Sequence, residues 1–155
     1  MKNDIKIILS FTGEYFFLSN FYEYPIYYDG IRYRNSEAAF QSAKCMNKDG
    51  RLGFSDLNPS EAKRFGRRVK LRPDWEDVKD QIMYDVVKAK FSDSKLAKML
   101  LDTGSAGLYE GNTWGDMYWG IDRTTLRGRN KLGEILMRVR DEIVKGIIPV
   151  NLQNN

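Results

Sequence analysis

The chain has 155 residues, 42% of them hydrophobic, with a net charge of +4. It suits one soluble globular domain over residues 1–155, with anionic partners such as phosphate esters or nucleic acid. It has no histidine and one cysteine, Cys45. That excludes an intrachain disulfide, a zinc site of Cys and His, and every nucleophile–histidine pair. No apolar run approaches the roughly 18 residues of a membrane span, and no signal peptide is evident, so we expect no membrane partner and a cytoplasmic location.

The N-terminal part of the chain predicts β-structure. Residues 5–10 are rich in β-branched side chains, as strands are. Residues 25–28 and 31–34 flank Asp29–Gly30, a dipeptide that favours the tight turn of an antiparallel hairpin. We therefore expect a strand followed by a hairpin.

Helices dominate the rest of the prediction. Asn35 or Ser36 caps a first helix that we expect to run to about Met46. Caps and apolar periodicity predict further helices over residues 60–66, 73–91, 95–102 and 131–145, the last capped by Asn130. Residues 107–128 lack periodicity and are expected to form a loop. The predicted fold class is α+β, a single mostly helical domain with a small antiparallel hairpin or sheet.

Three polar side chains fall on one face of the first predicted helix. Glu37, Gln41 and Lys44 stand at positions i, i+4 and i+7, which aims an acid, an amide and an amine at one patch. Without histidine, proton chemistry must come from Asp, Glu, Lys, Tyr or cysteine. Yet such spacing is common on solvated helix faces, and spacing alone favours an ordinary surface over a site.

Two other segments carry candidate binding residues. The stretch 114–120 sets two tryptophans beside glycines; these indoles can stack on a flat ring or pin the loop to the core, and the two readings weigh equally. The basic stretch 64–72 can hold phosphate, although a solvated charge run is the stronger reading. Arg129 lies beside the N-terminus of the last helix, where a cation opposes the helix dipole. An anion bound by that N-terminus would account for a cation there.

Several short motifs follow one another in an order that resembles a known family. They are Leu18-Ser19-Asn20-Phe21, Asp29-Gly30, Glu37 through Lys44, Arg72-Pro73-Asp74-Trp75, Lys90-Phe91, Thr103-Gly104, Trp119-Gly120 and the segment 130–137. Each motif alone is weak, but the ordered set is specific. Over about residues 10–143 the chain resembles the NADAR family, also called YbiA-like proteins.

The resemblance implies an N-glycosidase, which cleaves the bond between a ribose C1 and a nitrogen without a metal or other cofactor. Two substrate classes are associated with the family. One is the phosphoribosylamino-pyrimidine intermediates of riboflavin synthesis, which are phosphorylated ribosylamines. The other is ADP-ribosylated guanine, for which nucleic acid would carry the substrate. The alternatives are a non-catalytic module that binds ADP-ribose or nucleic acid, and an inactive relative.

By resemblance, Glu37, Gln41 and Lys44 match the family's central helix motif. Lys44 would attack C1 of the sugar, or capture its ring-opened aldehyde as a Schiff base. Either step needs an unprotonated amine and hence a lowered pKa. Glu37 would then transfer protons, and Gln41 would orient the sugar hydroxyls.

The resemblance also implies further pocket residues. Asp116 is expected to be catalytic and to hydrogen-bond the sugar or the base. Trp75 and Trp119 would stack against the base or close the cleft. The expected substrate-binding positions besides Gln41 are Asn20, Phe21, Trp75, Trp119, Gly120, Arg129 and Asn130.

Two departures from the family pattern bear on the substrate. Ala38 and Ala39 stand where members commonly have a histidine and an aromatic residue, which predicts a roomier and less polar pocket at the helix start. Residues 121–129 are bulkier and more basic than the glycine-rich family continuation. That loop favours a phosphate-rich substrate such as ADP-ribosyl nucleic acid.

Overall fold

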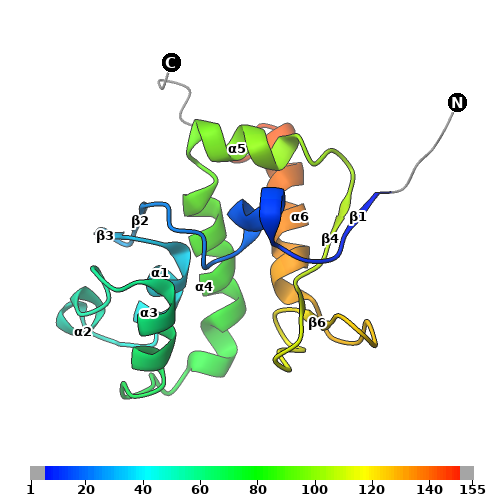
Figure 1. Ribbon diagram of the computed structural model, residues 1–155. Coiled ribbons are helices and arrows are strands. Elements are labelled where there is room, and N and C mark those ends of the chain that lie inside the picture. The colour runs from blue at the N-terminus through cyan, green and yellow to red at the C-terminus, as the bar shows by residue number, and fades with distance from the viewer. Residues whose placement is uncertain (1–5, 151–155) are drawn as a thin grey trace, which may run out of the picture. The chain divides into compact units, whose positions relative to one another are not determined.

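The computed structural model describes residues 6–150, which fall into two compact units (Figure 1). The central unit comprises Asn20–Lys90, and the terminal unit comprises the residues up to Ser19 together with those from Phe91 onward. None of the helices in the described part of the chain is long and apolar enough to cross a membrane.

The central unit opens with the predicted hairpin. Strands β2 (Ile26–Tyr28) and β3 (Ile31–Tyr33) pair antiparallel, with Ile26 opposite Tyr33. Asp29 and Gly30 both have positive φ, 50° and 82°, as a type I′ turn requires. Ile26, Ile31 and Tyr33 are buried, so one face of the hairpin joins the core of this unit.

Helix α1 (Ser36–Ser42) is shorter than predicted. The side chain of Asn35 caps it by accepting a hydrogen bond from the amide of Ala38 at 2.8 Å. The expectation that the helix continues to Met46 is wrong, because the chain tightens into i→i+3 bonds after Ser42. Asn47 then caps a separate helix, α2 (Lys48–Leu52), which the sequence analysis missed.

Two more helices complete the central unit. Asn58 and Glu61 form a reciprocal capping box at the start of α3 (Pro59–Gly66), which confirms the predicted helix there. Helix α4 (Trp75–Lys90) begins two residues later than the start predicted at Pro73. Helix α1 packs against both α3 and α4, and every residue of α1 is buried (Figure 1).

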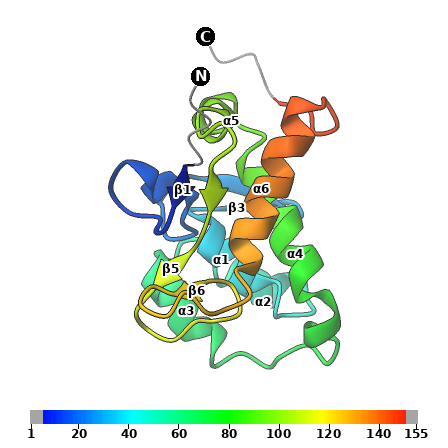
Figure 2. The same ribbon diagram turned by 90° about the vertical axis from the view of Figure 1, so that its right-hand side faces the viewer.

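The terminal unit contains more β-structure than predicted. Strand β1 (Ile7–Ile8) pairs in parallel with β4 (Gly107–Leu108), and β5 (Gly111–Asn112) pairs in parallel with β6 (Ile121–Asp122) (Figure 2). The segment 107–128 is therefore not only loop. Of the strand predicted over residues 5–10, Ile5 lies outside the described residues, and the pairing covers Ile7 and Ile8 alone.

Helices form the rest of the terminal unit. The 3₁₀ helix η1 (Gly13–Leu18) was not predicted, whereas α5 (Ser94–Leu101) and α6 (Lys131–Val144) match predicted helices closely. Helix α6 packs on α5 and β4. Gly133 permits this packing, because a Cβ there would overlap the carbonyl oxygen of Leu108. The α+β class with a mostly helical content is confirmed.

Candidate functional site

The polar triad, two residues on α1 and Lys44 in the turn after it, does not lie on a solvated face. Glu37 is 8% exposed, Gln41 is 7% exposed, and Lys44 is only partly exposed. Helices α3 and α4 pack against α1, so an acid and an amide are held inside the central unit. The reading of this face as ordinary surface is wrong. Burying such groups costs free energy unless they are paired.

Glu37 and Gln41 pair with each other. Nε2 of Gln41 donates a hydrogen bond to Oε2 of Glu37 at 2.7 Å, between residues one helical turn apart. Oε1 of Gln41 is buried without a hydrogen-bond partner among the described residues. The pair is thus held rigidly and one amide acceptor is left over.

Asn20 fastens the preceding loop to the start of α1. Its carbonyl oxygen accepts a hydrogen bond from the amide of Glu37 at 3.1 Å, and its Oδ1 accepts one from Oγ of Ser36 at 3.0 Å. Asn20 is itself buried. In this structure the predicted substrate-binding asparagine positions Glu37.

Lys44 lies in an environment that favours the free amine. Burial lowers the pKa of Lys44 below its ordinary value, and the nearby cation of Arg67 lowers it further, while Glu37 opposes the shift. Its Nζ lies 5.7 Å from the ring centroid of Trp75 and 3.5 Å from the carbonyl oxygen of Gly66. A lowered pKa is what a nucleophilic lysine requires.

Trp75 and Phe21 occupy different surroundings. Trp75 is 7% exposed and tilts against Phe40, with ring centroids 5.2 Å apart, so little of its ring surface is left for stacking on a base. Among the residues of the triad, Trp75 contacts Lys44 through a cation–π interaction. Phe21 is partly exposed, and Nζ of Lys63 lies 5.9 Å from its ring centroid.

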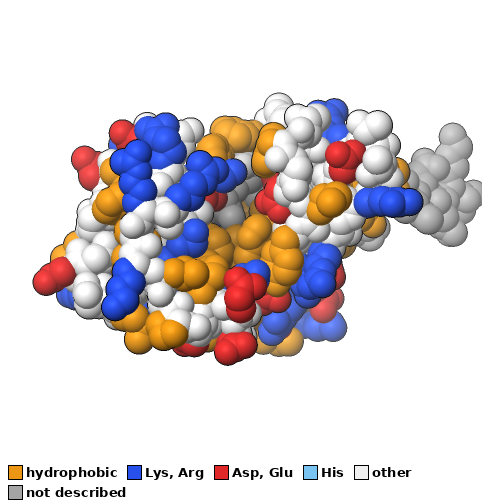
Figure 3. All heavy atoms as spheres, turned by 90° about the horizontal axis from the view of Figure 1, so that it is seen from below, with side chains coloured by type: hydrophobic (Ala, Val, Ile, Leu, Met, Phe, Trp, Pro, Cys, Tyr) orange, Lys and Arg blue, Asp and Glu red, His pale blue; other side chains and the backbone are white. Residues whose placement is uncertain are grey.

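The basic stretch is only partly a solvated charge run. Arg72 forms an ion pair with Asp74 at 2.7 Å. It also donates to the turn that follows α1, from its backbone amide to the carbonyl of Lys44 at 2.9 Å and from its guanidinium to that of Ala43 at 3.2 Å. Arg72 therefore holds the backbone of the candidate nucleophile. Other Lys and Arg side chains gather on the side of α2 and α3 in Figure 3.

The remaining predicted residues lie in the terminal unit. Oδ1 of Asp116 accepts hydrogen bonds from the amides of Tyr118 at 3.1 Å and Trp119 at 2.9 Å, which shapes the aromatic loop. The buried side chain of Asn112 bonds to both the amide and the carbonyl of Asp116. Sequence reasoning missed Asn112; its place among loop glycines gave no sign of burial.

Gly120 and Asn130 build the scaffold of that loop. A Cβ at Gly120 would overlap the carbonyl oxygen of Glu110. Asn130 adopts a left-handed conformation, and its side chain does not cap α6 as predicted. Instead its Nδ2 donates to the carbonyl of Leu108 at 2.9 Å, and its Oδ1 accepts from the amide of Glu110 at 3.0 Å.

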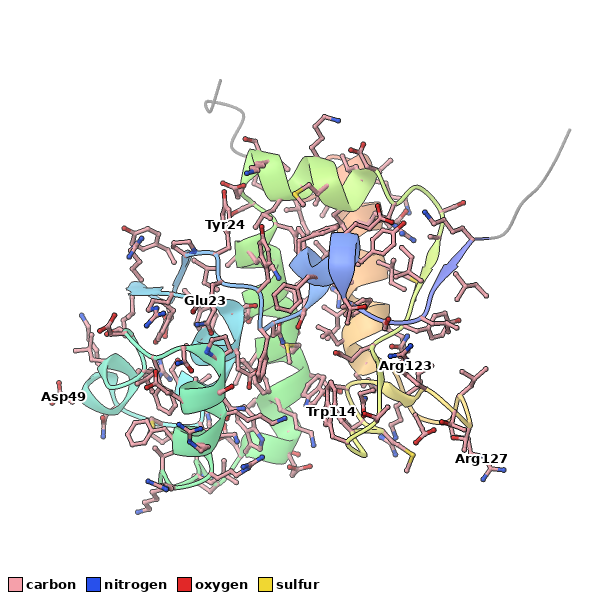
Figure 4. The ribbon with its side chains drawn as sticks, viewed as in Figure 1. Glu23, Tyr24, Asp49, Trp114, Arg123 and Arg127 are labelled. Atoms are coloured by element: carbon pink, nitrogen blue, oxygen red, sulfur yellow. The ribbon has the colours of Figure 1, made fainter. Side chains whose placement is uncertain are left out.

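Cationic and aromatic side chains are exposed on the same loop. Arg129 is exposed, with its guanidinium carbon 5.5 Å from the ring centroid of Tyr118. Trp114, Arg123 and Arg127 are also exposed, and Figure 4 shows them on this part of the chain. Trp114 is thus not pinned in the core, whereas Trp119 is only partly exposed.

The two alanines that depart from the family pattern do not widen a pocket. Ala38 and Ala39 are both completely buried in the core of the central unit. Neither borders solvent-accessible space, so the expected roomier pocket at the helix start is wrong. Across residues 6–150, no group of three or more Asp, Glu, Cys and His side chains is placed to hold a metal ion.

Comparison with known sequences assigns the chain to a family. The profile of the NADAR domain matches residues 10–144, most of the chain. The chain belongs to the NADAR family. The match extends over both compact units, and the polar triad lies within it.

Relatives of this NADAR protein carry informative names. It is 37% identical to N-glycosidase YbiA of Escherichia coli (strain K12) over 147 residues, which cover 92% of this chain and 91% of that protein. It is also 37% identical to a riboflavin biosynthesis protein of Vibrio vulnificus over 133 residues, 82% of this chain and 35% of that protein.

A solved structure agrees with the NADAR assignment. The NMR structure of the E. coli protein YbiA matches with a TM-score of 0.80 and 34% sequence identity. The match covers 100% of this chain and 94% of that one. The overall NADAR fold is therefore shared with an experimentally determined relative.

Proposed function

We propose that this NADAR protein is an N-glycosidase that hydrolyses the bond between a ribose C1 and a nitrogen of a base. The observation that carries the proposal is a partly buried lysine of lowered pKa, Lys44, in the turn that follows α1, the helix that holds the buried acid Glu37. A non-catalytic binding module does not require a lysine amine with a lowered pKa. The names of the relatives in E. coli and other bacteria point the same way.

In the proposed reaction Lys44 is the nucleophile and Glu37 transfers the protons. The free amine of Lys44 bonds to C1, and the electron pair of the C1–N bond leaves with the base nitrogen, which takes up a proton. Glu37 is the group that delivers this proton and later receives one from the attacking water. Water then cleaves the sugar–Lys44 bond, which releases the sugar and returns the amine. Gln41 holds the carboxyl group of Glu37 in place throughout.

Two substrate classes are candidates. Relatives named as riboflavin biosynthesis proteins, from Vibrio vulnificus and Zea mays, support a phosphoribosylamino-pyrimidine intermediate as the first. The exposed cations Arg123, Arg127 and Arg129 support the second, ADP-ribosylated guanine carried on nucleic acid, because phosphates attract such side chains. A cytoplasmic location stays a prediction.

Incubation with both substrate classes tests the proposal. Mass spectrometry should detect free base together with ribose phosphate or ADP-ribose from at least one class, and Lys44→Ala should abolish this release while the far-ultraviolet circular dichroism stays unchanged. Borohydride should trap a sugar adduct on Lys44 during turnover. Release from neither class by a folded sample would instead favour the binding module, and a fully active Lys44→Ala would exclude the lysine mechanism.

A further inference from the structure

Gly66, the last residue of α3, fits closely against the triad. It is buried, and a Cβ at this position would lie 2.8 Å from Cδ of Gln41 and closer still to its Oε1. Real Cβ atoms essentially never approach that closely. The amide of Gln41 therefore occupies space that any side chain at Gly66 would fill.

The backbone does not call for glycine at this position. Gly66 closes α3 and its φ is not in the left-handed region, so an alanine could adopt the same backbone conformation; inside helices alanine is favoured over glycine by roughly 0.5–1 kcal/mol. Gly30 has a positive φ, a backbone conformation that favours glycine over other residues, whereas Gly66 does not. The reason for glycine at this position is therefore the neighbouring side chain.

Gly66 also contacts the candidate nucleophile. Its carbonyl is among the last of α3, which lack partners within the helix. The partner that the structure shows for it is Nζ of Lys44, at 3.5 Å, the long limit of a hydrogen bond. One residue of α3 thus contacts both Gln41 of α1 and Lys44 in the turn that follows α1.

We propose that Gly66 is a positioning residue of the candidate active site. Because glycine has no side chain, the Gln41 amide can occupy the position from which it donates a hydrogen bond to Glu37. The effect on turnover rests on the proposed N-glycosidase function, whereas the packing effect stands without it.

Gly66→Ala should push the Gln41 amide away and break its 2.7 Å hydrogen bond to Glu37. A displaced group in an active site costs up to roughly a hundredfold in rate, so kcat should fall roughly tenfold to a hundredfold with KM nearly unchanged. The melting temperature should also fall by several degrees, although alanine normally stabilises a helix.

A double-mutant cycle with Gln41→Ala tests whether Gly66 acts through Gln41. Once Gln41 is shortened, adding Gly66→Ala should lower neither kcat nor the melting temperature further. Gly53→Ala is the matched control, because its Cβ would meet neighbours no closer than 3.3 Å and none of them belongs to the triad; it should leave kcat unchanged and lower the melting temperature less than Gly66→Ala does.

The outcomes separate this inference from the proposed function. Losses that multiply in the double variant, or a Gly66→Ala protein with unchanged kcat and melting temperature, would overturn the role of Gly66. If Gly66→Ala fails to fold, folding of the double variant supports the inference and its failure to fold contradicts it. If the wild type cleaves neither substrate class, the function fails, and the melting temperatures alone still decide the packing.

Discussion

Nε2 of Gln41 donates a hydrogen bond to Oε2 of Glu37 over 2.7 Å, and both side chains are more than nine-tenths buried. The amide gives the carboxylate one fixed orientation in a place that water barely reaches. This arrangement fixes the orientation of the group that transfers protons in the proposed mechanism, and it makes the stability of the protein depend on Gln41.

Gln41→Ala should destabilise the protein by about 1–3 kcal/mol, because a buried carboxylate loses a hydrogen-bond donor. Urea denaturation measures the change. Gln81→Ala is a matched control, since Gln81 donates to Asp85 at 3.0 Å with the same i,i+4 spacing on an exposed face of α4. The control should lose no more than about 0.5 kcal/mol. Equal losses for the two variants would contradict the buried pair.

Arg67→Ala should shift the pH dependence of turnover upward. The cation of Arg67 lowers the pKa of Lys44, so its removal raises that pKa and leaves less free amine at neutral pH. The half-maximal point of kcat/KM against pH should move to higher pH, and the maximal rate should be nearly retained. Arg68→Ala, the neighbouring exposed arginine, serves as the control. An unchanged pH profile would show that Arg67 does not tune Lys44.

Lys44→Arg should be inactive at every pH. Arginine keeps the positive charge and can keep the contact with Trp75, but it stays protonated and cannot act as a nucleophile. Loss of a covalent nucleophile should lower turnover by roughly a hundredfold or more. Raising the pH should not restore the activity. Retained activity would mean that Lys44 serves as a cation that binds phosphate.

Lys90 should make the stability of the protein depend on pH. It is 2% exposed, and burial lowers its pKa from 10.5 to about 7. Between these two values the unfolded chain binds more protons than the native state, so the free energy of unfolding rises with pH over this window. Below about pH 7 both states are protonated and the full cost of the buried charge remains.

Lys90→Met should therefore flatten the rise in stability between pH 7 and 10.5, the window set by the two pKa values. Urea denaturation at several pH values measures the slope, which one group can change by at most about 1.4 kcal/mol per pH unit. Lys88→Met, at an exposed position of the same helix, should leave the slope as it is in the wild type. A wild-type slope in Lys90→Met would contradict the buried titration.

Local signals explain why parts of the fold were predictable. The Asp29–Gly30 turn and the Asn58–Glu61 capping box depend on residues that are neighbours in the sequence, so their structures follow from the sequence directly. The end of α1 was not predictable in this way. Helical periodicity continues past Ser42, and the chain turns because Asn47 starts a new helix and Arg72 binds the carbonyls of Ala43 and Lys44 from a distant segment.

The roles of asparagines show the same limit. Asn35 caps α1 as expected, whereas the side chain of Asn130, at the start of α6, bonds to Leu108 of β4 and to the amide of Glu110. Both sit at N-cap positions, and the sequence does not distinguish them. What separates them is the backbone that lies within reach, since a side chain satisfies whichever unpaired carbonyl or amide the tertiary packing presents.

The sequence by itself determined which chemistry is available, because it has no histidine and places an acid, an amide and a lysine at helical spacing. Its ordered motifs also indicate the NADAR family. Only the tertiary structure decided that Glu37 and Gln41 are buried, that Lys44 has a lowered pKa, and that Gly66 leaves room for the Gln41 amide. The spacing of the three residues is a property of one short stretch of sequence. Burial, and with it the pKa of the amine, depends on α3 and α4 covering α1, because desolvation comes from neighbours distant in sequence.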